Sequence, residues 1–349
     1  MSAGAVGGRG GMPGFHALRV KRVVRETADA CSIRFDVPPD LASTFAYEAG
    51  QFVTLRVTIG GEALLRSYSM SSAPMIDDDL QVTVKRVPGG RVSNWVNDTL
   101  GEGDVVEVMR PAGRFVLGDT DRDIIAFAGG SGITPVFSIL KTAMARTSRR
   151  ARLFYANRDC EVVIFARDLR ALGDRFGDRL RVDHHADSER GIVDEGAVAT
   201  FAGDATDADV YVCGPEPFMV TVERALLGRG CSPDRMFLER FTPGEASVDD
   251  APVMEATSGP IELIIELGGR SVALQHRGGT TVLQSARFAG LRPPSSCESG
   301  NCGTCMARVV EGRVEMRANE VLTPGEVADG WILTCQAVPV SANVRVVYG

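Results

Sequence analysis

The spacing of hydrophobic and polar positions divides the chain into three regions, of which the first extends over residues 15–117. Short runs in which apolar and polar residues alternate are separated by Gly-Gly, Pro-Gly and Asp-rich turns. The six runs are HALRVKRVVRET, ACSIRFDVP, QFVTLRVTI, EALLRSYSM, LQVTVKRV and DVVEVMR, with one short helix near 92–100. This pattern predicts a small antiparallel six-stranded β-barrel.

The second region begins at residue 123, where compact apolar strands alternate with helices. The strands are DIIAFAG, ARLFYA, RLRVDHH, DVYVCG and RMFLERF, and the stretches TPVFSILKTAMAR and PFMVTVERALLGRG have helical spacing of apolar residues. Such alternation predicts an α/β domain with a parallel five-stranded sheet covered on both faces. The third region, from residue 261, has β runs around a helix near 281–288 and predicts a small α+β domain.

Composition places the boundaries between these regions. The first residues are Gly-rich, and residues 242–260 are rich in small, acidic and proline residues, as in linkers. We expect the following parts: a disordered tail at 1–14, the barrel at 15–118, the α/β domain at 119–243, a linker at 244–259 and the C-terminal domain at 260–349.

Charge and hydropathy exclude two classes of function. The 349 residues have a net charge of −7, whereas binding to nucleic acid requires clustered Lys and Arg. No apolar run reaches the roughly 18 residues that a membrane helix needs, and the first residues lack the apolar stretch of a signal peptide. We therefore expect no nucleic-acid partner, no membrane span and a location in the cytoplasm.

Four of the eight cysteines lie in the last 53 residues. Cys297, Cys302 and Cys305 follow the spacing C-x4-C-x2-C, and Cys335 follows Cys305 after a gap of 29 residues. This is the spacing of plant-type [2Fe–2S] ferredoxins. A structural zinc site or free buried cysteines are the alternatives, but zinc ribbons favour two CxxC pairs and this chain has one. The segment resembles the plant-type ferredoxin domain, a β-grasp fold, which implies a [2Fe–2S] cluster held by these four thiolates.

The string LRSYSMSSAP in the barrel region resembles the R-x-Y-[ST] motif of the ferredoxin–NADP reductase superfamily. Its guanidinium, aromatic ring and hydroxyl suit a flavin's pyrophosphate, ring system and N5 edge; an exposed strand is the alternative. The resemblance favours FAD over FMN and implies contacts from Arg66, Ser67, Tyr68, Ser69, Val84, Lys85, Arg86, Gly90, Val92 and Ser93.

The string AFAGGSGITP lies between a predicted strand and helix, where glycines allow a pyrophosphate to approach the backbone. It resembles the GGxGI[TA]P motif of the same superfamily, and VYVCGPEPFM resembles its CGP motif. The resemblance implies nucleotide contacts from Gly129, Gly130, Gly132, Thr134, Asn157, Arg158, Cys213, Gly214, Pro215 and Met219. It places Phe241 over the flavin face; for Phe241 and Glu239 the alternative is that they simply end the sheet. It gives Ser69, Cys213 and Glu239 catalytic roles near the flavin and the nicotinamide; the alternatives are a plain strand–turn–helix junction and a packed core thiol.

The choice of nucleotide rests on two residues after the second strand of the α/β region. Arg158 offers a positive charge to the 2′-phosphate of NADPH, whereas Asp159 repels it, so we expect NADH as the donor, with NADPH as the alternative. His184 and His185 are interpreted as a hydrogen-bonded loop pair rather than as metal ligands.

The order of flavin barrel, nucleotide domain and ferredoxin resembles the reductase components of multicomponent oxygenases, such as those of 3-ketosteroid 9α-hydroxylases and phenylacetyl-CoA oxygenases. The resemblance implies that electrons pass from NAD(P)H through FAD and the cluster to a terminal oxygenase, Rieske-type or di-iron, in a transient complex. A stand-alone flavin oxidase or ferric reductase, and a redox sensor without turnover, are the alternatives. Residues 261–349 hold eight basic and eight acidic side chains, so we expect an apolar docking patch around the cysteine loop, with Met306 as a candidate contact.

Overall fold

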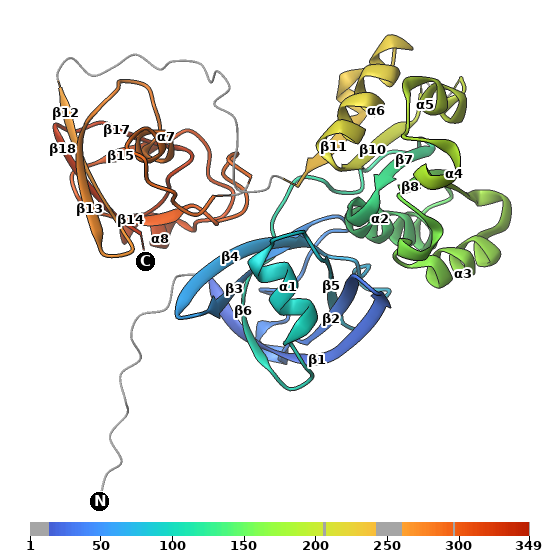
Figure 1. Ribbon diagram of the computed structural model, residues 1–349, viewed down its shortest axis with the longest axis horizontal. Helices are drawn as coiled ribbons and strands as arrows, with labels where there is room; N and C mark the ends of the chain where they lie inside the picture. The colour runs from blue at the N-terminus through green and yellow to red at the C-terminus, as the bar shows by residue number, and fades with distance from the viewer. Residues whose placement is uncertain (1–13, 205–206, 242–259, 296, 349) are drawn as a thin grey trace, which may run out of the picture. The chain divides into compact units, whose positions relative to one another are not determined.

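The computed structural model describes residues 14–204, 207–241, 260–295 and 297–348 (Figure 1). The predicted tail, apart from Gly14, and the predicted linker at 244–259 lie outside the described residues. One compact unit contains the barrel and the parallel sheet, and a second contains the C-terminal sheet. In the described part of the chain, no helix has both the length and the apolar composition needed to cross a membrane.

Six strands form the predicted antiparallel sheet, in the order β4-β3-β6-β1-β2-β5. They are β1 (Phe15–Thr27), β2 (Ala30–Asp36), β3 (Phe52–Ile59), β4 (Glu62–Ser69), β5 (Leu80–Lys85) and β6 (Val105–Met109). A bridge between Met70 and Val82 joins the two outermost strands, so the sheet closes into a barrel. Alternate residues of β2 (Cys31, Ile33 and Phe35) fill its interior, and the short helix α1 (Arg91–Asp98) packs against β3 and β5.

Five parallel strands form the second sheet, in the order β11-β10-β7-β8-β9. They are β7 (Ile124–Gly129), β8 (Ala151–Asn157), β9 (Leu180–Ala186), β10 (Asp209–Gly214) and β11 (Met236–Arg240). The helices are α2 (Ile133–Arg146), α3 (Ala166–Phe176), α4 (Asp187–Arg190), α5 (Glu195–Ala202) and α6 (Glu216–Gly228). One core lies under α2 and α3 and another under α5 and α6, so both faces are covered, as predicted.

The strand order reverses between β7 and β10 because the chain runs outward from β7 to β9 and then returns to the other side. Open α/β sheets bind ligands at the carboxyl ends of the strands beside such a switch point. The two Gly-containing motifs predicted to bind the nucleotide follow these two strands.

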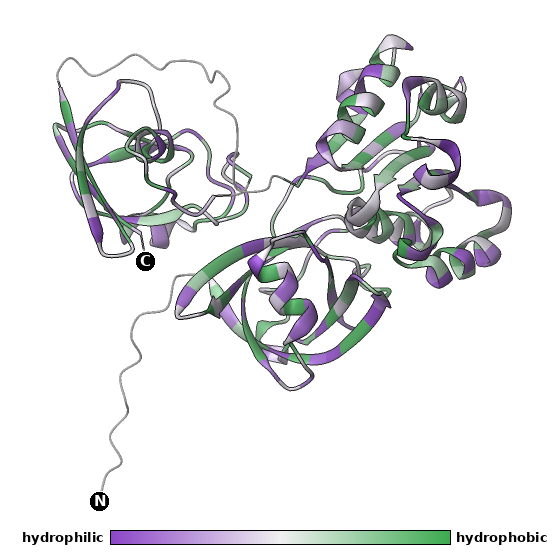
Figure 2. Cartoon of the chain, viewed as in Figure 1, coloured by the Kyte–Doolittle hydropathy of each residue, from purple (hydrophilic) through white to green (hydrophobic). Residues whose placement is uncertain are grey.

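The C-terminal region is a mixed five-stranded sheet in the order β13-β12-β18-β14-β16. Its elements are β12 (Ile261–Leu267), β13 (Arg270–His276), α7 (Val282–Phe288), β14 (Met306–Glu311), α8 (Pro324–Ala328), β16 (Trp331–Leu333) and β18 (Asn343–Val347). A small second sheet pairs β15 (Val314–Met316) with β17 (Ala337–Pro339). Because β12 runs parallel to β18 while the other neighbours are antiparallel, and α7 packs into the same core, this is the expected β-grasp arrangement. Along β12 the buried Ile261, Leu263 and Ile265 alternate with the less buried Glu262, Ile264 and Glu266, and Figure 2 shows the hydropathy of the strands.

The barrel and the parallel sheet are joined by packing and by polar contacts. Ala30 and Ala49 of the barrel belong to the core beneath α2. From α2, the Ser138 hydroxyl donates a 2.6 Å hydrogen bond to the carbonyl oxygen of Ser72, and Lys141 forms an ion pair with Asp77. These contacts hold α2, and with it the turn that precedes it, against the barrel.

Candidate functional site

The Gly-rich turn after β7 leaves its backbone amides without side-chain caps. Gly130 begins a 3-10 turn with φ of +52°, a value that favours glycine, and α2 starts at Ile133. Neither this turn nor α2 has a side-chain cap on its N-terminal N–H groups, which suits an anion. The buried Tyr155 hydroxyl donates a 3.1 Å hydrogen bond to the Gly130 carbonyl oxygen and so holds the turn in place. Sequence reasoning missed this contribution of Tyr155.

Glycines bring the turns after β7 and β10 into direct backbone contact. A Cβ atom on Gly132 would lie 2.1 Å from the Cys213 carbonyl oxygen, and one on Gly214 would lie 3.0 Å from the Gly129 nitrogen. Side chains at these positions would therefore force the two turns apart. The structure brings the two predicted nucleotide motifs together at the switch point.

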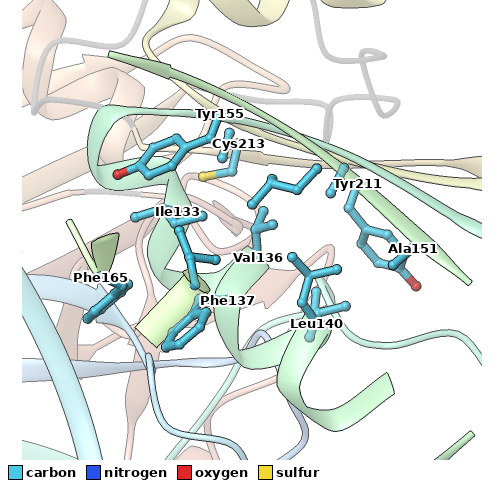
Figure 3. Packing of buried hydrophobic residues seen from close by; sticks show 14 of the residues in the cluster. Ile133, Val136, Phe137, Leu140, Ala151, Tyr155, Phe165, Tyr211 and Cys213 are labelled. Carbon is cyan, nitrogen blue, oxygen red and sulfur yellow. The ribbon is translucent and has the colours of Figure 1, made fainter. Parts of the chain in front are cut away.

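Cys213 ends β10 and is completely buried. It lies in register with Ala128 of β7 and Glu239 of β11 and belongs to the same packed cluster as Ile133 and Tyr155 (Figure 3). Burial, with a smaller effect from Glu239, raises the pKa of its thiol well above the ordinary value, so the group is neutral at physiological pH.

The other residues of this motif differ in exposure. Pro215 is the N-cap of α6, and Met219 is completely buried in the core beneath that helix. Phe241, just beyond β11, is 40% exposed. Met219 therefore supports the motif through packing, whereas Phe241 has a ring that is open to contact.

The carboxyl end of β8 holds a buried polar group without a protein partner. Asn157 is 5% exposed, and neither its amide oxygen nor its amide nitrogen has a hydrogen-bond partner in the described chain. Its neighbour Ala156 pairs with Gly129, so the amide lies at the same sheet edge as the Gly-rich turn. An unsatisfied buried amide is costly unless a ligand completes it, so Asn157 fits the predicted nucleotide site.

The side chains of Arg158 and Asp159, which follow Asn157, have different surroundings. Arg158 is exposed. The Asp159 carboxylate accepts hydrogen bonds from the backbone N–H groups of Glu161 (3.0 Å) and Val162 (3.2 Å) and caps the 3-10 turn there. Asp159 is therefore a fixed negative charge beside the expected ribose position.

The R-x-Y-S motif lies on β4. Ser67 shares a 3.0 Å hydroxyl–hydroxyl hydrogen bond with Thr54, and Ser69 is 4% exposed. Burial raises the pKa of the Tyr68 hydroxyl. The Arg66 side chain is exposed, which leaves its guanidinium accessible to a phosphate.

The G-x-x-S turn opens α1 as predicted. Gly90 is the N-cap without a side-chain hydrogen bond, so the N–H groups of this eight-residue helix are not capped by a side chain. The Ser93 hydroxyl accepts from the Val87 N–H at 3.1 Å, and a Cβ on Gly90 would lie 2.6 Å from that oxygen. Val92 is 1% exposed and packs inward. The turn is thus closed on itself and presents backbone donors, as a flavin phosphate requires.

The three residues at the end of β5 face three different environments. Val84 is completely buried, so only its backbone can contact a cofactor. The Lys85 ammonium lies 3.7 Å from Asp29 and 4.0 Å from the position of a Cβ on Gly130. Arg86 pairs with Asp98 at the far end of α1. Lys85 therefore brings positive charge from the barrel to the nucleotide turn.

The four predicted cluster ligands are arranged as two pairs of thiols. The Cys297 N–H donates to Cys302 Sγ at 3.5 Å, and the thiols of Cys305 and Cys335 interact in the same way as those of Cys297 and Cys302. The hydrogen bond from Cys302, with backbone donors, holds the pKa of Cys297 to about 5, while the thiol pairing and burial raise those of Cys302 and Cys305. Among the described residues no three His, Cys, Asp or Glu side chains converge as ligands of a single ion. Two thiol pairs suit a core with two irons.

Donors surround the sulfur atoms, as expected for thiolates that carry negative charge. The Asn301 N–H donates to Cys297 Sγ at 3.3 Å, and Gln336 Nε2 lies 3.6 Å from Cys335 Sγ. Gly300 has φ of +84°, and a Cβ there would lie 2.9 Å from the Ala318 carbonyl oxygen. These contacts agree with the predicted cluster loop.

Arg287 of α7 fixes this loop, and sequence reasoning did not find it. Its guanidinium binds both carboxylate oxygens of Glu298 and donates to the Ser295 hydroxyl at 2.8 Å. Glu298 has φ of +51°, which is unusual for a residue with a side chain. The bidentate pair holds this strained residue beside Cys297.

Two minor expectations can be compared with the structure. His185 is 5% exposed and hydrogen-bonds the Gly191 carbonyl oxygen at 2.8 Å, whereas His184 is exposed; both lie in β9 rather than in a loop. Met306 is 1% exposed, because it faces the core next to Cys305 and Leu333. The expectation that Met306 contributes to a docking patch is therefore wrong.

Comparison with known families identifies the three parts of the chain. Residues 17–117 match an oxidoreductase FAD-binding domain, residues 127–224 an oxidoreductase NAD-binding domain, and residues 265–340 a 2Fe-2S iron-sulfur cluster binding domain. These matches agree with the cofactors and fold expected from the sequence.

Relatives match this chain over nearly their whole length. The ferredoxin reductase component of 3-ketosteroid-9-alpha-monooxygenase from Rhodococcus rhodochrous is 40% identical, covering 94% of this chain and 95% of the relative. The glycine betaine monooxygenase reductase subunit from Pseudomonas aeruginosa is 34% identical, covering 93% of each. The structure of phthalate dioxygenase reductase, described as modular for electron transfer from pyridine nucleotides to [2Fe-2S], is 28% identical with a TM-score of 0.60, covering 96% of this chain and 98% of the other.

Proposed function

The chain belongs to the family of oxygenase reductase components with FAD-binding, NAD-binding and [2Fe–2S] domains, and we propose that it passes electrons from NADH to a separate terminal oxygenase. Its place among NAD(P)H-dependent electron-transfer reductases follows from the match over nearly the whole chain. The observation that supports a one-electron outlet is the pairing of Cys297 with Cys302 and of Cys305 with Cys335. When bound, FAD and the cluster convert a two-electron donor into single-electron transfers.

At the nucleotide site, the protein supplies binding groups and orientation. The uncapped N–H groups of the 130–132 turn bind the pyrophosphate, and Lys85 adds a positive charge beside them. The unpartnered amide of Asn157 binds the adenosine ribose, while the fixed carboxylate of Asp159 disfavours the 2′-phosphate of NADPH. These contacts support NADH as the donor.

At the flavin site, Arg66 and the N-terminus of α1 bind phosphate, and Tyr68 lies beside the ring system. The Ser69 hydroxyl would donate to the N5 edge of a bound flavin. Cys213 and Glu239, paired in register on β10 and β11, would border the nicotinamide, and the exposed ring of Phe241 would cover the flavin face. The neutral Cys213 thiol places no charge where the nicotinamide ring becomes cationic.

The terminal oxygenase, Rieske-type or di-iron, meets the C-terminal domain in a transient complex. Several charges of this domain are already paired internally, as in the Arg287–Glu298 and Arg345–Glu266 ion pairs. Little net field remains to steer an acidic or basic partner over a distance. Short-range apolar and hydrogen-bonded contacts around the cysteine loop are therefore the basis of docking.

The eight cysteines form no disulfide, which agrees with a reducing cytoplasm.

Reconstitution tests this function. The holoprotein is mixed anaerobically with the oxygenase encoded beside it and with NADH, and reduction of the oxygenase metal site is followed by absorbance. We expect NADH-dependent reduction that changes only a few-fold between low salt and about 0.3 M, because screening weakens long-range attraction more than close contacts. Protein that reduces oxygen or ferric chelates rapidly but fails to reduce any oxygenase supports the stand-alone reductase. Protein that binds cofactors but does not turn over is a sensor.

A further inference from the structure

The proposed reaction leaves one proton to be removed from the protein interior. Oxidation of NADH yields NAD⁺, two electrons and one proton, whereas an iron–sulfur cluster and a one-electron partner accept the electrons alone. One proton therefore has to leave the flavin site for each NADH consumed. Ser69, expected at the reacting edge of the flavin, is 4% exposed, so its hydroxyl has no direct access to water.

Three buried hydroxyl groups and one carboxylate form a continuous hydrogen-bonded chain on the outer face of the barrel. Ser71 Oγ lies 2.7 Å from Thr83 Oγ1, and Thr83 Oγ1 lies 2.7 Å from Ser32 Oγ. The Ser32 hydroxyl donates to Glu26 Oε1 at 2.5 Å. Ser32 and Ser71 are completely buried and Thr83 is 4% exposed. Since a hydroxyl both donates and accepts, each member can pass a proton to the next.

The inner end of this chain lies beside the flavin motif. Ser71 follows Ser69 by two residues, just beyond the end of β4. The antiparallel bridge between Met70 and Val82 places Ser69 opposite Thr83. The chain of hydroxyls therefore begins next to the residue expected at flavin N5.

The outer end opens into a cavity of about 830 Å³ between the barrel and helices α2 and α3. Glu26 is partly exposed and lines this cavity. Burial and the Asp168 carboxylate raise the pKa of Glu26, and the Ser32 hydrogen bond and Arg34 oppose that rise. The other charged lining groups come from the barrel, α2, the 3-10 turn Cys160–Val162 and α3. They are Arg25, Asp77, Asp78, Asp79, Lys141, Glu161, Arg167 and Arg175. A carboxyl group with a raised pKa at a solvent-open cavity can take up a proton and release it to water.

We propose that Ser71, Thr83, Ser32 and Glu26 form the exit path for the proton released at the flavin site. In this path a proton enters at Ser71, each hydroxyl passes its own proton outward, and Glu26 becomes a neutral carboxylic acid. Loss of that proton to the cavity restores the carboxylate. The inference rests on the proposed position of the flavin at Ser69.

Two variants interrupt the path at different depths, and a third is a matched control. Thr83→Val removes the central hydroxyl with little change in shape, and Glu26→Gln keeps an acceptor for Ser32 but cannot take up a proton. Thr54→Val is the control, because Thr54 is 1% exposed in the same barrel and shares its hydroxyl with Ser67 rather than with this chain.

The experiment uses full-length holoprotein and one equivalent of NADH in an anaerobic stopped-flow instrument. Flavin and cluster absorbance are followed together with an indicator dye that reports proton release. We expect both path variants to retain NADH-driven flavin reduction. Proton release and the later electron steps should slow by about tenfold or more, which is a smaller effect than loss of a positioned general acid or base usually causes. Acetate, admitted by the cavity, should restore Glu26→Gln but not Thr83→Val, which is interrupted in the buried part.

Two outcomes overturn the path: proton release in Glu26→Gln at the wild-type rate, or the same loss in Thr54→Val. Absence of FAD, or failure of NADH to reduce the flavin in the unmodified protein, would instead refute the proposed function. FAD and iron contents of each variant, measured first, separate these cases.

Discussion

Replacement of Gly132 by alanine tests the contact between the two nucleotide turns. Gly132 has φ of −61°, which alanine adopts readily, so the effect of the substitution is steric rather than conformational. The new methyl carbon would lie 2.1 Å from the Cys213 carbonyl oxygen and 2.4 Å from its carbon. Both are backbone atoms, so the turns must separate by about 1 Å to restore ordinary contact distances.

Two magnitudes follow from this displacement. Overpacking of this kind costs about 1–3 kcal/mol of stability, which lowers Tm by roughly 2–4 °C per kcal/mol in a unit of this size. A misplacement of about 1 Å at a reacting centre costs on the order of a hundredfold in rate. We therefore expect kcat/KM for NADH-driven flavin reduction to fall about a hundredfold while the FAD and iron contents stay unchanged.

Stopped-flow absorbance of the flavin measures the loss in rate, and thermal unfolding measures the loss in stability. Gly173→Ala is the matched control: it lies in α3 with no atom within 4 Å of the added Cβ. It should leave NADH kinetics unchanged and raise stability by about 1 kcal/mol, because glycine is unfavourable inside a helix. NADH kinetics within twofold of wild type in Gly132→Ala would refute the idea that this backbone contact positions the nicotinamide.

Three further predictions concern other parts of the chain. Cys305→Ser should lose the cluster, measured as iron and acid-labile sulfide. NADH-driven ferricyanide reduction should persist while cytochrome c reduction falls sharply. Equal loss of both activities with FAD retained would contradict electron transfer from the flavin through the cluster. Asp159→Asn keeps a capping side chain but removes a charge worth about 1 kcal/mol near a phosphate, so the preference for NADH in flavin reduction should narrow by about fivefold, and a wild-type preference for NADPH would overturn this reasoning. Asp209→Asn leaves Arg149, 2.6 Å away and buried, without its counter-charge, so denaturant unfolding should show a loss of about 3–5 kcal/mol, whereas a loss below 1 kcal/mol would mean that water reaches the pair.

The strands and the chemical motifs were predictable because their signals are local. Alternation marks β2 over a few residues, and the spacing of Cys297, Cys302 and Cys305 reflects the geometry of one loop. The glycines of the two nucleotide turns were recognised from sequence strings. Why Gly132 must be glycine depends on its contact with Cys213, which is 81 positions away, and only the structure shows it.

The elements missed by sequence reasoning lack such local signals. Helix α3 buries only Leu169 completely, contains Gly173 and starts without a side-chain cap, so its pattern is weak. Strands β15 and β17 have three residues each, too few to show alternation. Ser32 and Thr83 occupy outward positions of their strands, which suggests a solvent-exposed face, yet in the structure they are 0% and 4% exposed.

The packing of α2 against the barrel constrains the design of chimeric reductases. Because Ser138 and Lys141 of α2 bind Ser72 and Asp77 of the barrel, an α/β domain transplanted from a relative brings α2 without its matching surface. Such a graft should fold yet hold its nucleotide turn at the wrong angle to the flavin. Exchanging the barrel segment 71–79 together with α2 preserves the match. On the proposed nucleotide contacts, exchanging Asn157 and Asp159 in such a chimera changes the donor specificity without altering the cysteine loop.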